Sequence, residues 1–166
     1  MLFRSLTESA LQNGRLVVDA LHELRCVGVA VALDDFGAGY SSLRSIDELP
    51  LTRVKLDRSL TQDIESTASA AAIATSVIRL CQDLGLTVTA EGIERPEQLE
   101  VLMHCGDVHV QGYLIAKPAP LEDIARFIAA TPTDFASIWP DQRLVHSGSA
   151  RTHEAAVVPI SHSRRR

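Results

Sequence analysis

The chain has 166 residues, 46% of them hydrophobic, which is enough for one ordinary domain with a buried core. Its net charge of -5 provides no basic surface for duplex nucleic acid, which proteins bind by neutralising phosphates. The three cysteines lack the paired spacing of a disulfide framework or a zinc site. Because no apolar run predicts a membrane helix and no leader-like segment predicts a signal peptide, we expect a cytoplasmic protein.

The first part of the chain alternates between apolar runs and amphipathic segments. Residues 2–6 predict a first strand, and residues 9–25 predict a helix that ends shortly before Gly28. The apolar run at residues 29–33 is typical of a strand buried on both faces. This strand runs directly into two acids.

Two more strands and a helix follow. Residues 53–57 predict a strand that places Lys55 and Asp57 on one face. The alanine-rich helix after it has apolar residues at helical spacing, which predict one buried stripe: Ile73, Val77, Leu80 and Leu84. Residues 86–90 predict another strand, which ends at Glu91.

The same alternation continues to residue 129. A helix is predicted over residues 96–104, with Leu99, Leu102 and Met103 on its inner face, then a strand over 108–114 and a helix over 121–129. Alternation of this kind predicts an α/β protein with parallel strands, in either an open doubly wound sheet or part of a closed barrel. About five strands are expected, whereas a closed TIM-type (β/α) barrel has eight.

The composition changes near residue 131. Residues 1–130 are expected to form one domain, and residues 131–166 contain scattered prolines, a Ser-Gly-Ser stretch and three final arginines without a sustained period. This composition favours a disordered tail.

Polar residues follow several predicted strands at their carboxyl ends, where both architectures build functional sites. Asp34 and Asp35 offer hard oxygen ligands for Mg²⁺ or Mn²⁺, unless one caps the following loop and the other is solvated. Lys55 offers a cation for phosphodiester chemistry, or else a structural salt bridge. Glu91 adds a carboxylate, and Gln111 can both donate and accept hydrogen bonds with a ligand.

Four segments together resemble the EAL family of cyclic di-GMP phosphodiesterases: Leu33–Leu43, Val54–Ser59, Ala90–Glu94 and Val110–Leu114. The resemblance covers about residues 1–128 and implies a partial TIM-type barrel in which two divalent ions, Mg²⁺ or Mn²⁺, activate a water to hydrolyse cyclic di-GMP to linear pGpG. By position it implies these roles: Asp34, Asp35 and Glu91 as metal ligands, Glu91 and Lys55 as catalytic residues, Gln111 as a substrate-binding residue, and Glu8 and Glu94 as loop-stabilising residues.

Two departures from the family pattern bear on activity. Ser5 stands where the family has an acidic metal ligand, and the Glu-Ala-Leu segment and an Asn ligand that precede this position in the family are absent. We therefore expect the carboxyl-terminal part of an EAL domain, with weak metal binding and weak or no activity as an isolated chain. A homodimer, or a missing barrel half supplied in trans, would complete the barrel.

Two alternatives remain open at this point. The first is a catalytically degenerate module for cyclic di-GMP signalling or protein interaction, which Ser5 favours and the remaining site residues oppose. The second is an unrelated open α/β domain of the receiver type, suggested by paired acids at one strand end and a later lysine.

Overall fold

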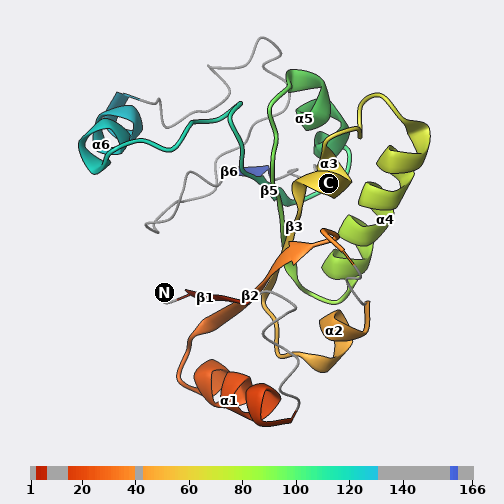
Figure 1. Cartoon of the computed structure of the whole chain (residues 1–166), viewed down its shortest axis with the longest axis vertical. Helices are drawn as coiled ribbons and strands as arrows, with labels where there is room; N and C mark the ends of the chain where they lie inside the picture. Colours follow the sequence, from red (N-terminus) through yellow and green to blue (C-terminus); the bar gives the residue numbers. More distant parts are fainter. Residues whose placement is uncertain (1–2, 7–14, 40–42, 131–157, 161–166) are drawn as a thin grey trace, which may run out of the picture.

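The computed structural model describes residues 3–6, 15–39, 43–130 and 158–160 (Figure 1). The described strands form one six-stranded sheet: β1 (Phe3–Leu6), β2 (Ala30–Phe36), β3 (Arg53–Leu56), β4 (Thr87–Ala90), β5 (Val108–Val110) and β6 (Val158–Ile160). The described helices are α1 (Arg15–Cys26), α2 (Leu43–Glu48), α3 (Arg58–Thr61), α4 (Ala68–Asp83), α5 (Pro96–Met103) and α6 (Leu121–Ala130).

The strand order identifies the kind of α/β architecture. Strands β1 to β5 are parallel, and each pairs with the next one in chain order. Each crossover therefore moves one strand further in the same direction, as in a (β/α) barrel, without the reversal of order that a doubly wound, receiver-type sheet shows. β6 pairs antiparallel with the far side of β5. The expected α/β class with about five parallel strands is confirmed.

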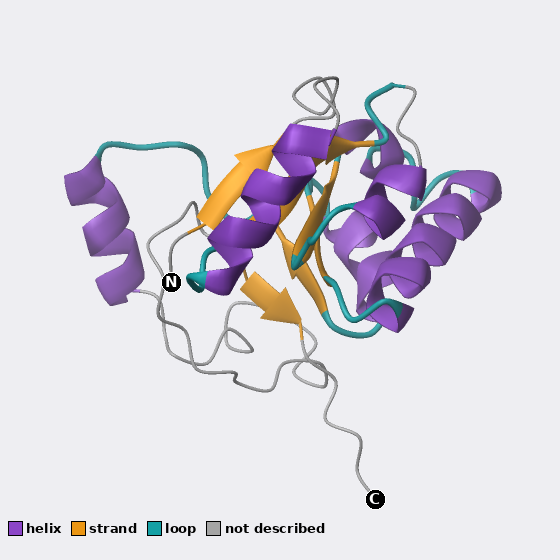
Figure 2. Ribbon diagram, turned by 90° about the horizontal axis from the view of Figure 1, so that it is seen from below, coloured by secondary structure: helices purple, strands orange, loops and turns teal. Residues whose placement is uncertain are grey.

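One hydrophobic core lies between a face of the sheet and the helices packed against it (Figure 2). Alternate strand residues point into it, including Leu33, Val54, Leu56, Val88 and Val108. The helices contribute Leu21, Ile46, Ile78 and Leu102. Helix α6 has no buried residue and stands apart from the sheet in both views.

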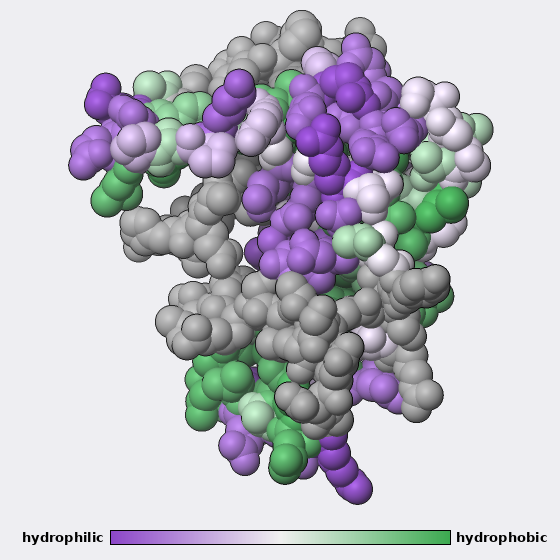
Figure 3. Space-filling model, viewed as in Figure 1, coloured by the Kyte–Doolittle hydropathy of each residue, from purple (hydrophilic) through white to green (hydrophobic). Residues whose placement is uncertain are grey.

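The buried face of α4 differs from the one that its sequence predicts. Three residues of the expected stripe are exposed: Ile73, Leu80 and Leu84. The helix instead buries Ala74, Ile78 and Cys81. An alanine-rich helix is apolar on more than one side, so packing against the sheet decides which face is buried. Figure 3 shows that hydrophobic surface remains exposed along α4. In α5 the predicted inner residues are buried, as expected.

Several boundaries also differ. Strand β2 continues through both acids to Phe36, and β5 ends at Val110, earlier than expected. In the predicted tail only residues 158–160 are described, so its disorder stays a prediction. Among the described helices, none has the length and apolar character that crossing a bilayer requires.

Candidate functional site

Three carboxylates meet at the carboxyl ends of β2 and β4. Each of Asp34, Asp35 and Glu91 places an oxygen within 4.8 Å of the others. Asp34 and Glu91 are partly buried, whereas Asp35 is exposed. Hard oxygen donors gathered at this spacing suit a divalent cation such as Mg²⁺, Mn²⁺ or Ca²⁺.

A local irregularity of β2 lets two adjacent aspartates face the same cluster. In a regular strand, neighbouring side chains point to opposite faces. Here the pairing of β2 with β3 shifts register between Leu33 and Phe36, and Asp35 has a positive φ of 54°. A left-handed conformation is costly for a residue other than glycine, and such strain concentrates at functional sites. The irregularity therefore turns Asp35 towards Asp34 and Glu91.

Lys55 lies between the two partly buried acids. Strand β3 runs between β2 and β4, and the Lys55 Nζ is 2.7 Å from Asp34 Oδ1 and 2.6 Å from Glu91 Oε1. Burial by itself would lower the pKa of Lys55, but hydrogen bonds and charge attraction from Asp34 and Glu91 outweigh it, and the pKa is raised above its ordinary value. Three carboxylates against one ammonium leave two negative charges, which one divalent cation balances.

The other predicted site residues lie around this cluster. Gln111 directly follows β5 at the same edge of the sheet, where its N–H donates to the Ala90 carbonyl at 2.9 Å. Glu94 pairs with Arg58 at 3.0 Å and so joins the loop after β4 to the start of α3. Glu8 lies outside the described residues, and Ser5 lies in β1.

Asp57 has a different position from the one expected. The sequence places it with Lys55 on one strand face, but β3 ends at Leu56. Asp57 is the N-cap of α3, and its carboxylate accepts a hydrogen bond from the Ser59 N–H at 2.8 Å. Aspartate is a preferred N-cap residue, so its carboxylate serves the first turn of α3 and does not project from the strand face.

A buried polar residue, Gln98, contacts the loop of the site and was not among the residues predicted for it. Gln98, on α5, is 1% exposed and hydrogen-bonds the loop that begins at Glu91. A glutamine at the third position of a helix can accept a hydrogen bond from the N-cap N–H, and this pattern was the signal that could have found it.

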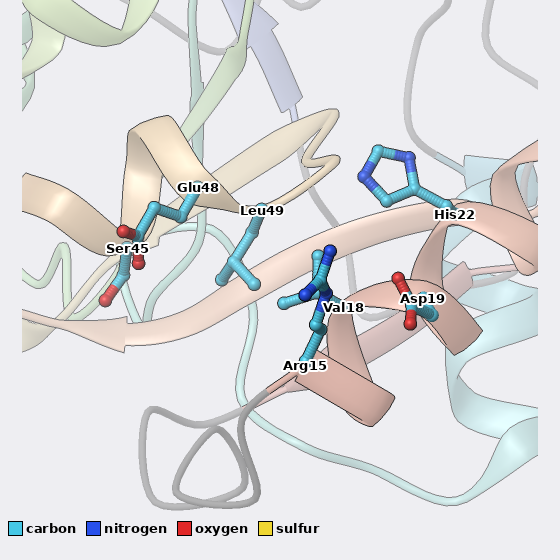
Figure 4. A pocket seen from close by; sticks show the side chains of 7 residues that line it. All are labelled: Arg15, Val18, Asp19, His22, Ser45, Glu48 and Leu49. Carbon is cyan, nitrogen blue, oxygen red and sulfur yellow. The ribbon is translucent and has the colours of Figure 1, made fainter.

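A separate pocket of about 530 Å³ lies between α1 and α2 (Figure 4). Its lining residues are Arg15, Val18, Asp19, His22, Ser45, Glu48 and Leu49. None of them belongs to the carboxylate cluster, and no sequence pattern indicated this pocket.

Comparison with known proteins identifies the family. The model of the EAL domain family matches residues 4–118. A curated relative, the cyclic di-GMP phosphodiesterase NbdA of Pseudomonas aeruginosa, is 42% identical over 132 residues, which are 79% of this chain and 17% of NbdA. The chain thus spans less than a fifth of that relative.

Solved structures agree with the family match. The EAL domain of Mycobacterium smegmatis DcpA superposes with a TM-score of 0.71 at 34% identity, covering 76% of this chain and 57% of that one. Klebsiella pneumoniae BlrP1, in a complex with manganese and cyclic di-GMP, gives 0.66 at 36% identity, covering 70% and 30%. The partial barrel fold expected from the sequence is confirmed by these neighbours.

Proposed function

Because this chain belongs to the EAL domain family, we propose that it provides the metal-binding face of a phosphodiesterase that hydrolyses cyclic di-GMP to linear pGpG with Mg²⁺ or Mn²⁺. The observation that carries the proposal is the cluster of Asp34, Asp35 and Glu91 with Lys55 between its two partly buried acids. The NbdA and BlrP1 matches support the choice of substrate.

Each residue of the cluster has a role that its chemistry allows. Asp34, Asp35 and Glu91 would hold the metal. When bound, the metal would polarise a phosphoryl oxygen of the substrate and make a water more acidic. Glu91 can accept a proton from the attacking water, because its carboxylate is at the cluster and is only partly buried. Lys55 would stabilise negative charge that develops on the phosphate. Gln111 would hydrogen-bond the substrate from the neighbouring strand end.

Two acids are assigned a supporting role. Glu94 would hold the loop after β4 through its ion pair with Arg58. Because the Arg58 side chain is 56% exposed, this ion pair contributes little to stability by itself. Glu8 would stabilise the loop after the paired aspartates, by family resemblance.

Weak metal binding is part of the proposal. Ser5 stands where the family has an acidic ligand, and a neutral hydroxyl is a poor ligand for a hard divalent cation. β1 lies at one edge of the described sheet. We propose that this edge pairs with further strands of a barrel, from a second copy or from another segment, in the cytoplasm.

The test is hydrolysis of cyclic di-GMP by the purified chain with Mn²⁺, with pGpG followed by chromatography. Glu91→Gln should abolish turnover, whereas Glu97→Gln, a change of the same kind at an exposed position of α5, should not. Ser5→Glu should increase both Mn²⁺ affinity and turnover. If the chain binds cyclic di-GMP but neither it nor Ser5→Glu produces pGpG, the degenerate binding module is the correct function.

A further inference from the structure

The loop that carries Glu91 is fixed by a buried amide. Gln98 accepts hydrogen bonds at Oε1 from the backbone N–H groups of Glu94 and Arg95, both at 2.9 Å. Its Nε2 donates to the Thr61 carbonyl at 2.9 Å and lies 3.4 Å from the Gln62 carbonyl. This set uses the full donor and acceptor capacity of a primary amide, and every partner is a backbone atom.

These bonds join the loop after β4 to α3. Thr61, whose carbonyl accepts from Gln98, is fully buried, and its hydroxyl donates to the Glu91 carbonyl at 2.6 Å. Both ends of the segment from Glu91 to Arg95 are thereby tied to Thr61, directly at Glu91 and through Gln98 at Arg95. The other side of the segment is held by Gln111, which follows β5, because the Ile93 N–H donates to the Gln111 carbonyl at 3.1 Å.

This arrangement matters for the carboxylate of Glu91. A metal site requires its ligands to be held within a fraction of an ångström, and side chains in regular elements achieve this more easily than side chains in loops. Glu91 follows β4 and precedes Gly92, which has a positive φ of 68°, so the chain turns immediately after the ligand. Without the amide, the segment would keep its bond to Gln111 and the bond from the Thr61 hydroxyl to the Glu91 carbonyl, but the backbone N–H groups of Glu94 and Arg95 would lose their link to α3.

We propose that Gln98 is a positioning residue that holds Glu91 in the orientation needed for metal binding. This inference rests on the proposed function, because it assumes that Glu91 is a ligand. A buried amide with four bonds could serve stability alone, so the distinguishing property is metal affinity. Residues that orient a metal ligand without binding the metal typically contribute about 10- to 100-fold to metal affinity.

The experiment measures Mn²⁺ binding by the full chain, from the electron paramagnetic resonance signal of the free ion, beside urea denaturation without metal. Gln98→Met replaces the amide by an apolar chain of similar length and should raise the Mn²⁺ Kd by about 10- to 100-fold. Leu102→Ala is the matched control, because Leu102 is fully buried on the same helix. It should lower stability while leaving the Kd within about twofold.

A double-mutant cycle tests whether the effect passes through Glu91. In the Glu91→Gln background, Gln98→Met should change the Kd by no more than about twofold. The inference is overturned if Gln98→Met binds Mn²⁺ as the wild type does, if it weakens binding equally in the Glu91→Gln background, or if Leu102→Ala weakens binding as much.

Gln98→Glu is a second variant that tests the inference if the Gln98→Met chain does not fold. It keeps both accepted bonds and loses the donated ones, so its Mn²⁺ Kd should also rise, and an unchanged Kd overturns the inference. If the Kd values follow the expected pattern but no pGpG forms, the proposed function fails and the positioning role stands. If the wild-type chain does not bind Mn²⁺, both are overturned.

Discussion

Replacing Gly112 by alanine should destabilise the fold and disturb the site together. The loop after β4 crosses directly over this glycine. A Cβ built at Gly112 would lie 2.6 Å from the carbonyl carbon of Ile93 and closer still to its nitrogen and oxygen, where ordinary van der Waals contact begins near 3.4 Å. The obstacle is backbone, which cannot rotate away as a side chain can. The loop would have to move by about an ångström.

The cost follows from what that movement breaks. The Ile93 N–H donates to the Gln111 carbonyl at 3.1 Å, and the Ile93 carbonyl accepts from the Leu114 N–H at 3.0 Å. Overpacking a filled region costs about 1 to 3 kcal/mol. Two weakened backbone hydrogen bonds add about 1 kcal/mol each, so we expect a loss of about 3 to 5 kcal/mol. This is a large part of the stability of a typical domain, about 5 to 15 kcal/mol.

Urea denaturation followed by circular dichroism measures the loss. Gly39→Ala is the matched control, because a Cβ there meets nothing within 4 Å and its φ is not left-handed. It should change the free energy of unfolding by about 1 kcal/mol or less. Gly28→Ala should lower the free energy of unfolding by about 1 to 2 kcal/mol, between the effects of Gly39→Ala and Gly112→Ala. A Cβ at position 28 meets nothing within 4 Å, but the φ of +85° is unfavourable for alanine. A Gly112→Ala chain as stable as the Gly39→Ala chain would refute the reasoning.

Two further predictions concern single side chains. Cys26 is exposed, whereas Cys81 and Cys105 are buried, and burial raises the pKa of Cys81 to about 11. A maleimide at neutral pH should therefore modify only Cys26 in the folded chain and all three cysteines in urea. Mass spectrometry of the labelled chain measures this difference. Labelling of Cys81 in the folded chain would contradict its burial. Burial by itself would raise the pKa of Asp57, but the hydrogen bonds that it accepts from Ser59 and from backbone N–H groups outweigh this, and the pKa is lowered. Its contribution to stability is therefore present above the unfolded-state pKa and is lost as the pH falls through the folded-state pKa. Asp57→Ala should cost about 1 kcal/mol at neutral pH and less in strong acid, and an equal cost at both would show that the charge plays no part.

Local patterns were sufficient for the architecture. A buried parallel strand is a continuous apolar run, and an amphipathic helix repeats every three to four residues, so the chain shows its alternation of elements without long-range information. The parallel sheet follows from that alternation, and it places the residues after each strand at one edge. Asp34, Lys55 and Glu91 could be brought together on these grounds because they lie at or near the ends of neighbouring strands.

Contacts between distant segments decided the rest. The sequence of α4 offers several apolar faces, and packing on the sheet selected the one with Ile78. A regular pleat would have separated Asp34 from Asp35, and the bulge against β3 brought them together.

The order of elements, the family pattern and the edge of the sheet that carries the acids therefore followed from local features of the chain. Only the tertiary structure showed that Gln98 joins the loop of Glu91 to α3. The two kinds of feature differ in sequence separation. Periodicity and capping depend on neighbours a few residues apart, whereas the hydrogen bond from Gln98 to Thr61 joins residues 37 positions apart. Folding alone brings those two residues together.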